Sequence, residues 1–201
     1  MNNKKSESSM KGTLIFTALL MIFIIGIAVF STSSKSSWTK SVVLTDKKIL
    51  TRGHTVKPVV YNTKGNPPTG GDHFPAWQNC GYFPAGVYTE AAVHSLEHGA
   101  VWLTWNKPLN DKETQFVQTL TASNKYLLAS QYPTQDSPVI LTAWGVQLKL
   151  KSLSEPGVLG FIAKYENGPQ TPEPGAACTN GIDSKPGVTP VITNDTHVMN
   201  K

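Results

Sequence analysis

The sequence predicts an α+β domain in which a small mixed sheet is flanked by two or three helices. Short apolar runs typical of strands alternate with helical patterns over residues 89–168, after a long segment rich in Pro, Gly and aromatic residues. An uncharged apolar stretch near the N-terminus predicts that one transmembrane helix precedes this domain.

The stretch from Gly12 to Phe30 is 19 residues long, carries no charge and is nearly all apolar. At the rise of an α-helix it spans about 28 Å, which is close to the thickness of a bilayer core. Because Lys4, Lys5 and Lys11 precede it, the positive-inside rule predicts a single-pass anchor with a cytoplasmic N-terminus. The alternative is a cleaved signal peptide, in which case the domain would be secreted.

These features predict five segments along the chain. We expect a cytoplasmic basic segment (1–11), a transmembrane signal anchor (12–31), a linker (32–37), an extracytoplasmic α+β domain (38–178) and a loose C-terminal tail (179–201). The domain is therefore expected on the outer side of the cell membrane.

The charge of the chain limits its partners. The net charge is +5, from 18 Lys and Arg against 13 Asp and Glu, and Arg52 is the single arginine. Guanidinium groups are the preferred readers of phosphates and bases, so we expect no binding of nucleic acid. The expected partners are the membrane, through the N-terminal helix, and an unidentified protein of the cell envelope.

The first half of the domain is expected to be extended. Residues 41–63 hold short apolar runs that suit one or two strands, and residues 64–88 form the long loop rich in Pro, Gly and aromatic residues. A short helix is predicted from Thr89, as N-cap, to His98, with Gly99 ending it.

The second half alternates more regularly. "AVWLTW" predicts a buried strand, "LNDKETQFVQTLTASN" a helix that starts at an Asn/Asp cap, and "KYLLASQYP" and "SPVILTAWGVQLKLKS" one strand each. "EPGVLGFIAKYENG" predicts a last helix with Leu159, Ile162 and Ala163 facing inward and Gly168 ending it. The predicted order is strand, helix, strand, strand, helix.

The chain has two cysteines, Cys80 and Cys178. In an oxidising compartment an isolated pair is most simply a disulfide. Closing a loop of this length is worth roughly 4–5 kcal/mol in chain entropy. The alternatives are two thiolate metal ligands or a redox couple.

The strongest candidate site contains three histidines and a glutamate. In "AVHSLEHGAVWLTW", His94 and His98 are one helical turn apart and can chelate one cation. Glu97 can be a fourth ligand or can orient an imidazole, and His73 in "GGDHFPAW" would complete the set. Three imidazoles suit zinc or copper. The leading hypothesis is therefore binding of copper or zinc through these residues.

Two further residues are expected to support the site. Asp72 can orient the imidazole of His73, and Gly99 ends the helix beside the site. His54 and His197 are interpreted as surface residues outside it.

Other functions stay open for the same residues. His94-Ser95-Leu96-Glu97-His98 matches the H-x-x-E-H pattern of zinc peptidases, but Gly99 and the strand that follows allow no long helix of the kind those enzymes use. The histidines can instead be structural, in a non-enzymatic envelope interaction module. A metal-dependent hydrolase with Glu97 as base is the third hypothesis, and an enzyme is not favoured.

Four separated motifs carry a family resemblance. In order, "PPTGGDHFPAWQNCGYF", "AVHSLEHGAVWLTW", "VILTAWGVQLKL" and "FIAKYENGPQTPEPGAAC" resemble the bacterial family called domain of unknown function 3105, over residues 66–178. The resemblance implies an exported or membrane-anchored protein and no particular activity. It makes motif positions of the candidate site residues and of several others, namely His73, His94, Glu97, His98, Gly99, Trp144, Gly145, Gly168, Pro169 and Cys178.

Overall fold

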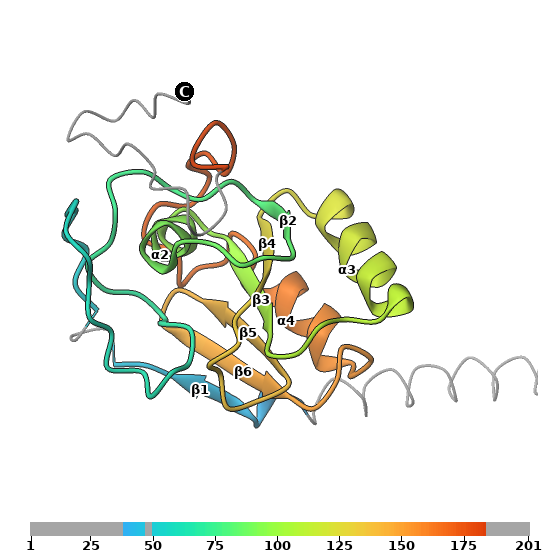
Figure 1. The fold of residues 1–201 in the computed structure, drawn as a ribbon. Helices are drawn as coiled ribbons and strands as arrows, with labels where there is room; N and C mark the ends of the chain where they lie inside the picture. Colours follow the sequence, from blue (N-terminus) through green and yellow to red (C-terminus); the bar gives the residue numbers. More distant parts are fainter. Residues whose placement is uncertain (1–37, 47–49, 184–201) are drawn as a thin grey trace, which may run out of the picture. The chain divides into compact units, whose positions relative to one another are not determined.

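The computed structural model describes residues 38–46 and 50–183 (Figure 1). From Ser41 onward the described chain forms one compact unit. The expected cytoplasmic segment, transmembrane helix and linker (1–37) lie outside the described residues. Among the helices that the structure describes, none is long and apolar enough to cross a bilayer.

Six short strands form one mixed sheet in the order β1-β6-β5-β3-β4-β2. They are β1 (Val42–Leu44), β2 (Gly81–Phe83), β3 (Val101–Trp105), β4 (Leu127–Gln131), β5 (Val139–Ala143) and β6 (Val146–Leu150). Strands β2, β4 and β3 pair in parallel, whereas β3, β5, β6 and β1 pair antiparallel. The predicted α+β class with a mixed sheet is confirmed.

Three helices cover this sheet: α2 (Thr89–Glu97), α3 (Asp111–Ser123) and α4 (Gly157–Tyr165). The connection β2-α2-β3 and the connection β3-α3-β4 run in opposite directions along the sheet, and right-handed crossovers then place their helices on opposite faces. Figure 1 shows this arrangement, with α2 on one side of the sheet and α3 and α4 on the other.

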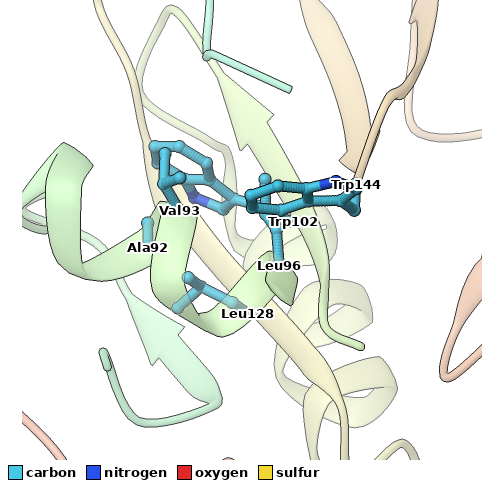
Figure 2. Packing of buried hydrophobic residues seen from close by; sticks show 6 residues of the cluster. All are labelled: Ala92, Val93, Leu96, Trp102, Leu128 and Trp144. Carbon is cyan, nitrogen blue, oxygen red and sulfur yellow. The ribbon is translucent and has the colours of Figure 1, made fainter. Parts of the chain in front are cut away.

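Helix α2 is held against the sheet by its apolar side. Ala92, Val93 and Leu96 recur at helical spacing and pack on Trp102, Leu128 and Trp144 (Figure 2). All six side chains are buried. Burial of this kind is worth about 1.5–3 kcal/mol for each large aliphatic side chain, so the position of α2 on the sheet is firmly set.

Helix α3 begins where the sequence predicts, at an Asn cap. The side chain of Asn110 accepts a hydrogen bond from the Glu113 backbone N–H at 3.0 Å, and the Glu113 carboxylate accepts one from the Asn110 backbone N–H at 3.0 Å. This reciprocal capping box satisfies two donors that the first helical turn leaves unpaired.

The segment predicted as a single strand before α4 is instead a hairpin. Ala143 pairs with Val146, so β5 and β6 are joined through Trp144 and Gly145 alone. Gly145 has φ +70°, which favours glycine, and Trp144 is buried against α2 rather than continuing a strand. The prediction was wrong because an apolar Trp stands where a polar turn residue is usual.

Helix boundaries and faces differ from prediction in smaller ways. Thr89 is the first residue of α2 rather than its N-cap, and α4 ends at Tyr165, ahead of Gly168. In α4 the buried face holds Val158, Phe161, Ile162 and Tyr165, while Leu159 and Ala163 are exposed. The two aromatic residues, Phe161 and Tyr165, lie on the buried face, which is rotated by about one position from the predicted one.

The packed chain also continues beyond Cys178, the expected end of the domain. Ile182 is 1% exposed and forms a parallel bridge with Gln78. Residues 179–183 therefore belong to the domain rather than to a loose tail.

Candidate metal centre

Helix α2 presents its polar side to the long loop. Opposite the apolar side, His94 and Glu97 lie one turn apart, so both side chains point the same way. Both are buried. His98 follows as the C-cap residue, and Gly99 with φ +110° turns the chain into β3. A polar pair is thus fixed on a rigid, core-anchored helix.

A short bridge in the loop region places two more imidazoles beside this pair. His54 and His73 form a parallel β-bridge, in which Thr55 N–H donates to the His73 carbonyl at 2.8 Å and His73 N–H donates to the Gly53 carbonyl at 2.9 Å. The Asp72 carboxylate also accepts a hydrogen bond from Gly53 N–H at 2.9 Å. These bonds tie the chain around His54 to the chain around His73.

The result is a cluster of four potential metal ligands, His54, His73, His94 and Glu97. One nitrogen or oxygen of each lies within 4.8 Å of the corresponding atom of every other member. The Nε2 atom of His73 is 2.9 Å from Oε2 of Glu97, and that of His54 is 4.0 Å from the same oxygen. We call these four side chains the His3Glu cluster.

Hydrogen bonds to backbone carbonyls set the tautomer of the buried imidazoles. Nδ1 of His73 lies 2.8 Å from the Gly71 carbonyl oxygen, and Nδ1 of His94 lies 2.6 Å from that of Phe74. Because a carbonyl oxygen only accepts, each Nδ1 carries the hydrogen, and the neutral ring has its lone pair on Nε2. Metal-binding histidines usually donate their other N–H in this way.

The Nε2 atom of His73 has no hydrogen-bond partner although the residue is fully buried. It lies 2.9 Å from Oε2 of Glu97, so that in the neutral ring a lone pair lies beside an anion. Leaving a buried polar atom unsatisfied costs about 1–3 kcal/mol. A cation between His73 and Glu97 removes this conflict.

Burial disfavours protonation of the His94 imidazole. Burial, together with the neighbouring His73 and His98, lowers the pKa of His94 to about 3. Burial would raise the pKa of Glu97, but the close His73 imidazole and the charge of Arg52 outweigh it and hold that pKa below its usual value. His94 therefore offers a free base and Glu97 an anion, as a metal ion requires.

The size of the cluster suits one transition-metal ion. Bonds of about 2.0–2.1 Å put two donors on opposite sides of one ion at most about 4.2 Å apart, so a pair 4.8 Å apart must close by at least about 0.6 Å. The cluster contains no sulfur ligand. Three imidazoles and a carboxylate suit zinc, copper(II) and other divalent ions of the first transition series.

Of the four residues predicted as metal ligands, the structure brings His73, His94 and Glu97 together. His98 lies next to them, with its ring centroid 4.5 Å from that of His94, but it is outside the four-atom set. Its Nδ1 lies 2.6 Å from the Ala177 carbonyl oxygen, and its Nε2 is 3.8 Å from the Glu173 carboxylate. His98 therefore faces the C-terminal segment.

His54, and not the expected His98, is the third histidine of the cluster. It is exposed, as predicted, with half of its side-chain surface accessible, yet it belongs to the cluster. No spacing in the sequence marks it, because its position depends on the bridge to His73, 19 residues away.

The two supporting residues act differently from expectation. Asp72 does not hydrogen-bond the His73 ring, whose Nδ1 is held by the Gly71 carbonyl; it fastens the segment that carries His54 instead. Gly99 ends α2 as expected, and its carbonyl accepts a hydrogen bond from Asn167 N–H at 2.8 Å.

The arrangement differs from that of an H-x-x-E-H peptidase helix. There the two histidines bind the metal and the glutamate acts on water, whereas here Glu97 is within the cluster and His98 is outside it. Arg52 also lies against the carboxylate, with Nη1 3.6 Å from Oε1. The geometry favours Glu97 as a ligand rather than as a base.

The disulfide between Cys80 and Cys178 is formed, with Cα atoms 5.3 Å apart. It confirms the predicted pairing and leaves no free cysteine in the described chain. The segment around Cys178 also supplies the Ala177 carbonyl that holds His98. The disulfide is thus structural support beside the site and not part of it.

A groove of about 590 Å³ is lined in part by residues 70–72, which directly precede His73. Thr51 and Asp72 belong to its lining, but none of the four cluster residues does. The groove borders the site without opening onto the ligand atoms.

Comparison with known proteins gives one match. The profile of the DUF3105 family, described as a protein of unknown function, matches residues 54–180. Neither the curated proteins nor the solved structures gave a match. The matched range contains all four members of the His3Glu cluster.

Proposed function

The chain belongs to the DUF3105 family, and we propose that it binds one divalent transition-metal ion, zinc or copper(II), through the His3Glu cluster. The observation that supports this most is the buried Nε2 of His73, which has no hydrogen-bond partner and faces the Glu97 carboxylate at 2.9 Å. A metal ion bound to both groups would replace the unfavourable contact between the Nε2 lone pair and the carboxylate with two metal–ligand bonds.

The pre-set tautomers support the same proposal. His73 and His94 each present Nε2 inward because a backbone carbonyl holds Nδ1–H. Little side-chain entropy is then lost on binding, since α2 is already fixed by its packing. The His73 and His94 side chains therefore need little reorientation to bind a cation.

The proposal includes a location outside the cytoplasm, at the membrane. The apolar stretch from Gly12 to Phe30 supports an anchor, and the disulfide suits an oxidising compartment. In that setting the protein would hold or hand over a metal at the cell envelope.

The test is metal analysis of the full-length protein, purified without a histidine tag and incubated with zinc or copper(II). We expect one ion per chain in the wild type and loss of that ion in His54→Ala. His54 is exposed, so this variant should still fold. The affinity should fall by at least the 10–100-fold that removal of an outer partner of a ligand causes.

His98→Gln is the matched control, because His98 is adjacent to the cluster but outside it. It should keep the ion, with circular dichroism and thermal unfolding confirming that both variants are folded. Equal loss in the two variants would show that the ligand set is wrong. No ion in the wild type would mean that the histidines form a structural polar network, as in an interaction module.

A further inference from the structure

We propose that the metal in the His3Glu cluster binds a small oxyanion, such as a carboxylate or phosphate, at its solvent side, where Arg52 holds the anion. This inference rests on the proposed function. It names the class of ligand that the bound metal would take.

The two sides of the cluster differ in exposure. His73, His94 and Glu97 are buried and close the site from the interior, whereas about half of the side-chain surface of both His54 and Arg52 is accessible. A ligand from solution can therefore reach the metal only past His54 and Arg52 within the described part of the chain. Copper(II) favours tetragonal coordination and zinc can expand to five ligands, so an additional position is chemically available.

The charge on that side favours an anion. Imidazoles are neutral when they bind a metal, so the local charges are those of the divalent ion, Arg52, Glu97 and Asp72. Together they leave one net positive charge around a partly buried centre. An anion on the metal neutralises it, and a neutral ligand does not.

Arg52 is placed to select that anion. Its Nη1 is 3.6 Å from Oε1 of Glu97, which is an ion pair longer than a hydrogen bond. When the Glu97 carboxylate is committed to a metal, the guanidinium loses part of this attraction. Its planar set of donors matches the oxygen pair of a carboxylate or phosphate.

The experiment uses the copper(II)-loaded full-length protein and azide as a spectroscopic anion, read by its charge-transfer band. Phosphate and acetate are then added in separate competition titrations. We expect azide to bind, both oxyanions to displace it, and Arg52→Gln to weaken all three anions by about tenfold or more. Affinity for copper itself should not fall, because Arg52 supplies no metal ligand and its charge repels the cation.

Lys57→Gln is the control, because it removes the same charge from an exposed side chain three residues from His54. It separates the general loss of positive charge from the local guanidinium contact. Copper binding without any effect of azide, phosphate or acetate would overturn this inference and leave the proposed function intact. Equal weakening in both variants would overturn the role of Arg52. A protein that takes up neither copper nor zinc would refute the proposed function itself.

Discussion

His73 shows how one residue can define a site. It is fully buried, its Nδ1–H is held by the Gly71 carbonyl, and its Nε2 lies 2.9 Å from the Glu97 carboxylate without a hydrogen bond to any described residue. A histidine that only stabilised its loop would have both nitrogens satisfied, as most buried polar atoms have. Nε2 therefore does not hold the loop, and it lies within the His3Glu cluster.

Binding of a metal at this atom should raise stability. At a free zinc concentration 100 times the dissociation constant, linkage gives about 2.7 kcal/mol of added unfolding free energy. The gain should largely disappear in Glu97→Gln, which keeps the size of the side chain but loses the anionic ligand. Urea unfolding with zinc and with a chelator measures it.

Glu173→Gln is the control, since the exposed Glu173 carboxylate approaches His98 and lies outside the cluster. It should show the same gain as the wild type. A gain retained in Glu97→Gln would exclude Glu97 as a ligand.

The sequence predicts the part of the site that local spacing encodes. His94 and Glu97 are three residues apart on a short helix, and His73 stands in a Gly-rich loop, so their proximity can be expected from chemistry and helical geometry. The sequence does not predict that His54, rather than His98, is the third histidine of the cluster. That arrangement depends on the α2 C-cap, where the chain turns at Gly99, and on a bridge between distant loop segments.

At the scale of elements, the amphipathic pattern of α2 and the cap of α3 were predicted correctly, whereas the buried face of α4 and the β5–β6 turn were not. The capping box of α3 and the apolar side of α2 follow directly from residue types. The β5–β6 hairpin was missed because its turn contains Trp144, which the core of α2 buries. Trp144 occupies the turn because it packs against α2, which is distant in sequence, and the local sequence pattern does not predict such a contact.

Two contacts of Asp136 fasten the long loop to the sheet, and their contribution to the stability of the fold should depend on pH. The Asp136 carboxylate lies 2.6 Å from Lys149 Nζ on β6 and accepts a hydrogen bond from the Asn66 side chain. The Lys149 and Asn66 hydrogen bonds lower the pKa of Asp136 to about 2. Because the folded pKa lies below the unfolded value of 3.8, the stabilisation is present above that value and is lost as the pH falls toward 2.

Asp136→Asn should therefore be less stable than the wild type at neutral pH and indistinguishable from it at acidic pH. The carboxylate is exposed, so the difference should be under about 1 kcal/mol. Urea unfolding at several pH values, with Lys149→Gln and the double variant, measures the coupling. A difference that did not vary with pH would rule out the ion pair as its origin.

At the scale of the whole molecule, the C-terminal segment closes the domain over α2. Cys178 is bonded to Cys80, Ile182 bridges to Gln78, and Glu173 N–H donates to the Glu97 carbonyl at 3.0 Å. Residues 169–183 of this segment contain no helix or strand. The sequence predicted its attachment through the disulfide, but not the packing of Ile182, since a single apolar residue in a polar tail carries no pattern.

Replacing both cysteines with serine tests whether this closure is structural or part of the metal site. The disulfide joins residues 98 apart in sequence, and the chain-entropy estimate for such a loop is about 4–5 kcal/mol of unfolding free energy. None of the four ligands lies in the C-terminal segment, so a variant kept at a temperature where it is folded should still bind one metal ion per chain. Urea unfolding and metal analysis on the same preparation give both quantities. Loss of the metal from a folded double variant would mean that the cysteines or their segment complete the site, whereas large destabilisation with full metal content would assign them to holding the domain closed around it.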